Sequence, residues 1–189
     1  FSQPHRLTSG RGCPFHSLWL MTDPSESFVC AVCGESHSGL STDTAFTLPD
    51  VVWAIPVPER EQHAKWTSDL CQMGERYFIR CLLPIEFTDR PGYYGWGVWA
   101  EVDWLVFKRY LELYEADGSE EPPATGQLSN EVAAYGDTVG LPVSIQFGPS
   151  SNRPNLSFAK GVGHSFAHEA ASGMSDSRYH EVLAIRGHK

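Results

Sequence analysis

The sequence lacks both a long run of apolar residues and an excess of positive charge. No stretch approaches the roughly 18 consecutive apolar residues that a membrane-spanning helix needs. Lysine and arginine number 14 against 23 aspartates and glutamates, so the formal net charge is -9. Such a chain repels phosphate backbones and anionic lipid surfaces. We therefore expect a soluble protein with no nucleic-acid or membrane partner, whose partner is an unidentified small molecule or protein.

Common catalytic and nucleotide-binding motifs are also missing. The sequence contains no Gly-x-Ser-x-Gly nucleophile elbow, no P-loop, no dinucleotide glycine fingerprint and no calcium loop. A cysteine and histidine dyad has no local signature, and a catalytic carboxylate pair cannot be selected from so many acidic residues. The sequence leaves open whether the protein is an enzyme.

The length and composition predict one folded domain. The chain has 189 residues, of which 41% are hydrophobic and 12% aromatic. This is enough apolar surface for a stable core without the help of disulfides or bound metals. The first 20 residues have no periodicity, and their apolar run from 15 to 20 is too short and interrupted for a signal peptide. We expect residues 1–20 to be a leader or foreign segment outside the fold, and residues 21–189 to form a single α+β domain.

Hydrophobic periodicity predicts a mainly antiparallel sheet with a few packed helices. Apolar residues alternate from Glu75 to Phe87, as in a half-buried strand, and Gly92–Ala100 is the expected hairpin partner. Pro84 cannot donate to a ladder, which predicts an edge strand or a bulge there. An amphipathic helix is expected at about 103–115. Further strands are expected at 28–31, 141–147 and 155–159, and further short helices at 51–54, 59–65, 164–171 and after Ser175.

The most specific motif is Cys30-Ala-Val-Cys33-Gly34, in which two thiols lie three positions apart before a glycine. This spacing is typical of a metal knuckle at a strand end, which supplies half of a tetrahedral zinc site. His37 and Cys71 are the nearest residues able to complete a Cys₃His site. The leading hypothesis is therefore a cytoplasmic zinc-binding module in which Zn²⁺ has a structural role and leaves no open position for catalysis.

Two other interpretations of the cysteines remain open. A Cys-x-x-Cys pair can be a reactive or redox dithiol, although no helix start or βαβ pattern follows it here. The thiols can also be ordinary buried or free side chains. Five cysteines, an odd number with this spacing, are typical of a reducing compartment, which predicts a cytoplasmic protein. Cys81 lies on the apolar face of the clearest strand and is expected in the core.

An aromatic cluster supports a second functional hypothesis. Trp96 and Trp99, with Tyr93, Tyr94 and Trp104 nearby, surround glycines and could stack a flat or sugar-like ligand. Core packing is the alternative, because strand alternation sends Trp96 and Trp99 to opposite faces. The second hypothesis is a small-ligand-binding protein or enzyme with a pocket near Trp96, Trp99 and His164 and a reactive cysteine pair.

Two histidines near the C-terminus are weaker candidates. His164 and His168 are four residues apart, which in a helix places two imidazoles on one face. The metalloprotease pattern His-Glu-x-x-His is absent, because Glu169 follows the second histidine, His168, and does not lie between the two histidines. Solvent-exposed histidines are the favoured interpretation.

Several collinear motifs resemble a bacterial family named domain of unknown function 2199. They include Cys30-Ala-Val-Cys33-Gly34-Glu-Ser-His37, Thr67-Ser-Asp-Leu-Cys71, Arg76-Tyr-Phe-Ile-Arg80, Gly95-Trp-Gly-Val-Trp99, Arg109-Tyr-Leu-Glu-Leu-Tyr114, Leu128-Ser-Asn130 and His164-Ser-Phe-Ala167, with Glu169 and Gly173 in step. The resemblance implies an intracellular bacterial protein, without an established activity or substrate. It adds weight to Cys30, Cys33, His37, Cys71 and His164, whereas Ser165 and Ala170 depart from the family pattern.

Overall fold

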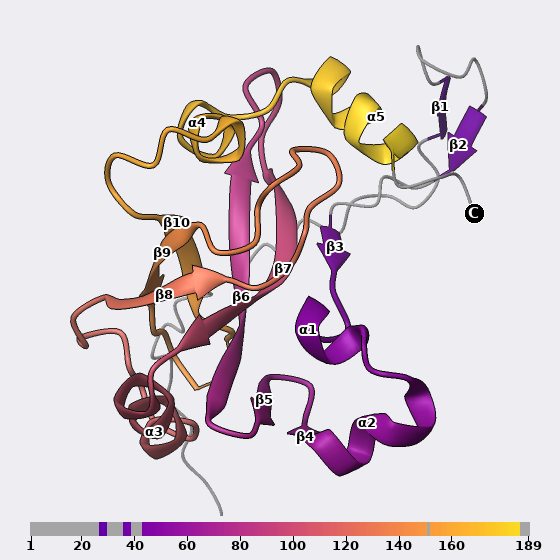
Figure 1. The fold of residues 1–189 in the computed structure, drawn as a ribbon. Helices are drawn as coiled ribbons and strands as arrows, with labels where there is room; N and C mark the ends of the chain where they lie inside the picture. Colours follow the sequence, from indigo (N-terminus) through magenta and orange to yellow (C-terminus); the bar gives the residue numbers. More distant parts are fainter. Residues whose placement is uncertain (1–26, 30–35, 39–42, 151, 186–189) are drawn as a thin grey trace, which may run out of the picture.

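The computed structural model describes residues 27–29, 36–38, 43–150 and 152–185, shown in colour in Figure 1. The predicted leader at 1–20 lies outside the described residues, as do Cys30 and Cys33 of the metal knuckle. Within the described part, no helix has both the length and the apolar character needed to cross a membrane.

A long hairpin forms the centre of the fold. Strand β6 (Arg76–Glu86) pairs antiparallel with β7 (Tyr93–Val102) from Tyr77 opposite Val102 to Glu86 opposite Tyr93. Gly92, with φ of 99°, supplies the left-handed conformation needed in the connecting turn. The strand predicted from period-2 alternation and its expected glycine-containing partner are therefore both confirmed, as is their pairing.

Three later strands close this hairpin into a five-stranded barrel (Figure 1). Strands β8 (Ala124–Leu128), β9 (Pro142–Gln146) and β10 (Asn155–Phe158) continue the antiparallel order from β7. Neighbouring strands of a meander alternate in direction, so the first and fifth run the same way and must pair in parallel. The closing pair is Asn155 with Leu82, and the Leu82 amide donates to the Pro154 carbonyl at 2.9 Å.

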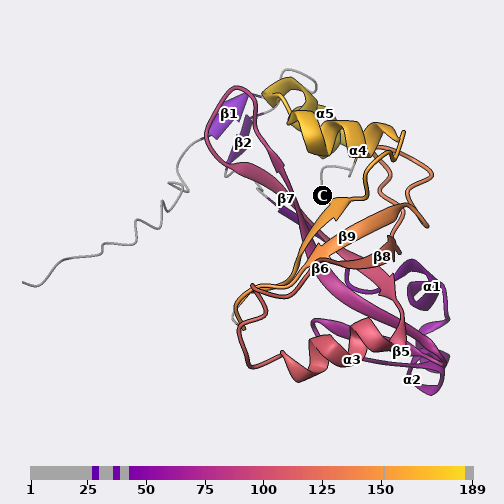
Figure 2. The same cartoon turned by 90° about the vertical axis from the view of Figure 1, so that its left-hand side faces the viewer.

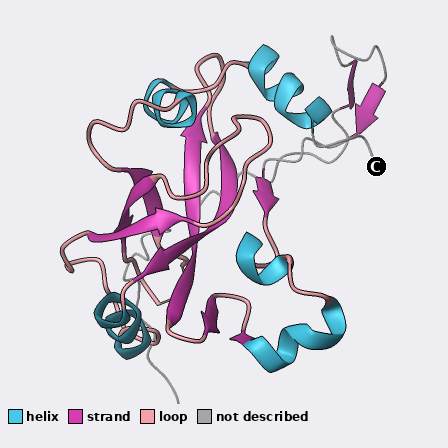
Figure 3. Cartoon of the chain, viewed as in Figure 1, coloured by secondary structure: helices cyan, strands magenta, loops and turns pink. Residues whose placement is uncertain are grey.

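Shorter elements extend the sheet beyond the barrel (Figure 3). Strand β3 (Asp43–Ala45) adds to β7 in parallel, whereas β5 (Leu70–Met73) adds antiparallel to β6 and β4 (Ala64–Trp66) adds to β5. Helices α1 (Asp50–Trp53) and α2 (Val57–His63) connect β3 with β4. Strands β1 (Ser27–Val29) and β2 (Ser36–Ser38) form a separate antiparallel pair.

Three capped helices cover the ends of the barrel. Figure 2 shows α3 (Trp104–Glu112) at one end and α4 (Ser165–Ser172) with α5 (Asp176–Ile185) at the other. At the start of each helix, a side chain accepts a hydrogen bond from a backbone amide that has no partner within the helix. Asp103 accepts from the Val106 amide, His164 from the Phe166 amide, and Ser175 from the Arg178 amide. The expected helices are thus confirmed, with boundaries that differ by a few residues.

Alternation along β6 and β7 produces two separate cores. One set of side chains fills the barrel, including Cys81, Trp96 and Phe166, and this confirms the core position expected for Cys81. The opposite set packs under α1 and β5. This second core consists of Leu48, Val52, Ala64, Cys71, Phe78 and Trp99.

Pro84 lies at a local edge of an otherwise central strand. The amides of Arg80 and Leu82 both donate away from β7, to Asp69 and Pro154 respectively. Pro84 is two residues further on, so its missing N–H faces the same side, past the point where β10 pairs with β6. The edge inferred from Pro84 is correct locally, but β6 as a whole has neighbours on both sides.

The buried side-chain amide of Asn130 replaces strand pairing at the point where the neighbour of β7 changes from β3 to β8. Strand β7 pairs with β3 up to Gly97 and with β8 from Ala100, so Trp99 has no strand partner on that side. The Asn130 side chain accepts from the Trp99 amide at 2.8 Å and donates to the Leu48 carbonyl at 2.9 Å and to Asp50 at 2.8 Å. Asn130 is fully buried, so its loss would leave several polar groups unsatisfied.

Gly173 at the end of α4 provides a test of this packing. Its φ is 88°, and a Cβ there would lie 2.9 Å from the Glu86 carbonyl oxygen. We predict that Gly173→Ala lowers the free energy of unfolding by about 2 kcal/mol, because strain and a backbone clash combine. Urea denaturation measures this change. Gly163→Ala is the control, since Gly163 has open space around it; equal losses in the two variants would contradict the prediction.

Candidate functional site

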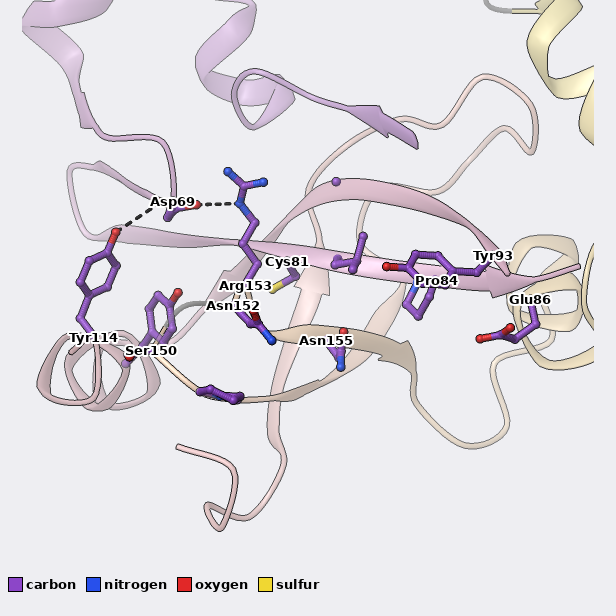
Figure 4. Close-up of a pocket in the computed structure, with 15 residues that line it drawn as sticks. Asp69, Cys81, Pro84, Glu86, Tyr93, Tyr114, Ser150, Asn152, Arg153 and Asn155 are labelled. Atoms are coloured by element: carbon purple, nitrogen blue, oxygen red, sulfur yellow. Dashed lines mark hydrogen bonds and ion pairs between the residues drawn. The ribbon is translucent and has the colours of Figure 1, made fainter. Parts of the chain in front are cut away.

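An open groove of about 740 Å³ lies along the edge of β6 beside the loop between β9 and β10 (Figure 4). It occurs where β10 separates from β6 after their single pair, so none of the described strands pairs with this edge beyond Leu82. Leu82, Pro84 and Gly97 line it from the sheet. Loop residues 148–150, 152 and 153, with Asn155 at the start of β10, form the facing wall. The remaining lining residues come from the β4–β5 turn, α3 and the turn after it, β6 and β7: Asp69, Tyr110, Tyr114, Cys81, Glu86 and Tyr93.

One end of the groove contains a hydrogen-bonded ion pair. The Arg153 Nε atom donates to Asp69 Oδ1 at 2.7 Å, and the Tyr114 hydroxyl donates to Asp69 Oδ2 at 3.3 Å (Figure 4). Thr67 fixes the turn that carries Asp69, because its hydroxyl accepts from the amides of Asp69 and Leu70 at 3.2 and 3.1 Å. Asp69 therefore joins the β4–β5 turn, the turn that follows α3 and the β9–β10 loop at one point.

The charges around Asp69 shift the ionisation of its neighbours. Burial raises the pKa of Asp69, but hydrogen bonds from Ser68, Arg153 and Tyr114 outweigh it and the net pKa is lowered. Partial burial and the adjacent Asp69 carboxylate raise the pKa of Tyr114. Burial and the charge of Arg153 lower the pKa of Arg80, which also lies beside Asp69. Asp69 therefore pairs directly with Arg153, while Arg80 lies close enough to feel the charges of both groups.

The other end of the groove has polar groups free for a ligand. Glu86, Tyr93 and Asn155 line it, and Tyr93 is 44% exposed. Among the described residues, no hydrogen bond or ion pair occupies the side chains of these three residues. Two carboxylates and one guanidinium line the whole groove, so its formal charge is negative.

The tryptophans predicted to share a pocket lie in different cores. Trp96 is inside the barrel, where its ring packs edge-to-face on Phe166 at 6.0 Å, and Trp99 is in the second core. The Trp99 Nε1 atom donates to the Phe46 carbonyl at 3.1 Å. Strand alternation thus separates them as the sequence indicated, and neither ring lines the groove.

Both ring nitrogens of His164 have partners. Its Nε2 lies 3.0 Å from the Gly136 carbonyl oxygen, and its Nδ1 accepts from the Phe166 amide at 3.2 Å. His164 therefore caps α4 and ties it to the loop at Gly136. His168 is exposed, which agrees with the favoured interpretation of this histidine.

Two of the four predicted zinc ligands lie outside the described residues. Cys30 and Cys33 cannot be placed, and His37 is in β2 opposite Phe28. Cys71 is buried on β5, and burial raises the pKa of its thiol to about 11. Figures 1 and 2 both draw the β1–β2 pair and β5 at opposite ends of the molecule. In the described part of the chain, no three or more His, Cys, Asp or Glu side chains form a metal-binding group.

Sequence reasoning missed the residues that build the groove. Asp69 and Arg153 are 84 positions apart, and Asp69 and Tyr114 are 45 apart, so no local spacing indicates their contact. One signal was available: Asp69 is in the middle of the Thr67-Ser-Asp-Leu-Cys71 motif, which drew attention only for its cysteine.

These features define an α+β protein built on a closed five-stranded barrel, with a polar groove along the barrel seam. The model of a family described as "Uncharacterized protein conserved in bacteria (DUF2199)" matches residues 29–174, and the chain belongs to this family. The resemblance seen in the sequence motifs is thereby confirmed. No curated protein and no solved structure matches the chain.

The lowered pKa of Asp69 predicts a pH-dependent contribution to stability. A carboxyl whose pKa is lower in the folded state stabilises the fold above its unfolded pKa, and this contribution disappears as the pH falls through the folded value. We expect Asp69→Asn to be less stable than the wild type at neutral pH, with the difference shrinking below about pH 4. Urea midpoints measured across this range test the prediction. Glu61→Gln, at an exposed position, serves as the control, and a pH-independent difference for Asp69→Asn would refute it.

Proposed function

We propose that this protein binds a small molecule in the groove between β6 and the β9–β10 loop. The observation that carries the proposal is the convergence of polar side chains from four separate segments on one cavity of about 740 Å³. Ligand sites are typically concave, of this size, and contain a few polar groups on an otherwise packed framework. This location replaces the pocket expected near Trp96, Trp99 and His164, whose side chains are committed to core packing and helix capping.

Two features suit the groove to ligand binding. Asp69, Arg153 and Tyr114 hold one another in place, so this end is ordered before a ligand arrives. The side chains of Glu86, Tyr93 and Asn155 at the other end remain available to a ligand. A framework with both properties loses little conformational entropy on binding while retaining groups for recognition.

Filling the groove should abolish binding without unfolding the protein. Asn155 is exposed and lines the groove, so we predict that Asn155→Trp places an indole in the ligand space. A set of small metabolites and polar fragments is screened by nuclear magnetic resonance, using amide shifts of the ¹⁵N-labelled full chain. We expect compounds that shift groove residues in the wild type to lose their effect in Asn155→Trp.

The control for this experiment adds the same ring elsewhere. Thr125→Trp carries an indole at an exposed position of β8 that does not line the groove, and it should bind as the wild type does. If no compound shifts groove residues, or if Thr125→Trp loses binding equally, the proposed function is wrong.

We also propose a structural zinc at the Cys-x-x-Cys motif. The antiparallel pairing of β1 with β2 supports this, because the short sequence joining the two strands contains both Cys30 and Cys33, and β2 carries His37. Knuckles of this type supply two thiolates from one short connection. Cys71, the fourth ligand expected from the sequence, is buried on β5 at the opposite end of the molecule from β1 and β2, so this proposal rests on Cys30, Cys33 and His37 and takes its fourth ligand from elsewhere.

Metal analysis of the full chain, purified without an affinity tag, tests the zinc proposal. We predict about one zinc per chain, lost in Cys30→Ser and retained in the control Cys13→Ser. Cys71→Ser determines whether Cys71 is a ligand, since zinc retention with altered stability would assign it to the core alone. Absence of metal together with rapid alkylation of Cys30 and Cys33 would overturn the zinc site and favour a reactive dithiol.

A further inference from the structure

We infer that the groove binds a neutral, polyhydroxylated ring compound of the carbohydrate class, an inference that rests on the proposed small-molecule function. Three properties of the groove lead to this class: its charge, its mixture of hydrogen-bond donors and acceptors, and its exposed aromatic rings. Each property excludes a different group of alternative ligands.

The charge of the groove disfavours anionic ligands. Its only guanidinium among the described lining residues is Arg153, which already pairs with Asp69 at 2.7 Å. Glu86 adds an uncompensated carboxylate at the other end, and the whole chain has a net charge of -9. A phosphate or carboxylate would therefore compete with Asp69 for Arg153 and approach a surface of negative net charge. Nucleotides and acidic metabolites fit this site poorly.

The hydrogen-bonding groups favour hydroxyls. Glu86 and Asp69 offer acceptors, Arg153 offers donors, and Asn155 and Tyr93 offer both. A hydroxyl group both donates and accepts, so a ligand with several hydroxyls can satisfy a mixed set of this kind without a net charge. An ammonium ligand would satisfy the carboxylates but would leave the donors of Arg153 and Asn155 without acceptors.

Tyrosine rings provide surfaces for the C–H faces of a sugar. Tyr93 and Tyr114 are 44% and 42% exposed and lie toward opposite ends of the groove in Figure 4. Tyr110 packs edge-to-face against Tyr114, with ring centroids 5.9 Å apart, and so supports that ring. A tyrosine has an apolar body with a polar tip, which matches the apolar faces and hydroxylated rim of a pyranose. Two rings at separate ends suit a chain of sugar units better than a single unit.

The test uses neutral and charged probes on the full chain. Maltotriose, cellotriose and N,N′,N″-triacetylchitotriose are compared with trigalacturonate, glucose 6-phosphate and spermidine by titration of the ¹⁵N-labelled protein. We expect at least one neutral trisaccharide to shift the amides of groove residues, with a dissociation constant that is insensitive to ionic strength. Tyr93→Ala should raise that constant roughly tenfold, because it removes a stacking surface.

Glu86→Ala and its control Glu61→Ala each remove one carboxylate. Glu86 lines the groove and Glu61 is an exposed residue of α2, so only Glu86→Ala should weaken trisaccharide binding. If only the charged probes shift groove residues, the carbohydrate inference is overturned while the small-molecule proposal stands. If the trisaccharides bind but do not respond to Tyr93→Ala or Glu86→Ala, the inference also fails. Failure of these probes and of the wider metabolite screen would overturn both.

Discussion

The pairing of β6 with β7 is the constraint on which the rest of the structure depends. These strands are registered from Tyr77 opposite Val102 to Glu86 opposite Tyr93, and every other strand of the large sheet attaches directly or indirectly to one of them. Because successive side chains alternate between faces, a slip of one residue would exchange the contents of the two cores. Trp96 and Trp99 would then change places between the barrel and the second core. The two cores are therefore specified together by one register.

The groove is a consequence of how an odd number of strands closes. The first and fifth strands of the meander run in parallel, and they meet at only one residue pair before diverging. The divergence leaves the β6 edge uncovered at Pro84. Because proline has no backbone N–H, no hydrogen-bond donor is left without a strand partner at that position. Asp69, Arg153 and Tyr114 then bind the surrounding segments to one another beside the seam. The divergence that ends the pairing between β6 and β10 thus also creates the groove.

Most of the local structure could be predicted from the sequence, because it depends on near neighbours in the chain. The alternation from Glu75 to Phe87 indicated β6, the glycine-rich Gly92–Ala100 segment indicated β7, and the spacing of Trp104 and Phe107 indicated α3. The short strands β3, β4, β5 and β8 were missed, since each has only three to five residues and depends on pairing for its definition. The groove was missed for the same reason, because Asp69 and Arg153 meet only after the barrel closes.

Closure of the barrel also determines where the large sheet ends. Within the described part of the chain, its two terminal strands are β3 and β4, each three residues long. Unpaired strand edges are templates onto which other polypeptides can add, and long flat edges promote self-association. A strand of three residues offers few unpaired backbone N–H and C=O groups with which another polypeptide could pair. By confining its sheet ends to β3 and β4, this architecture gives the extended sheet intrinsic protection against edge-to-edge aggregation.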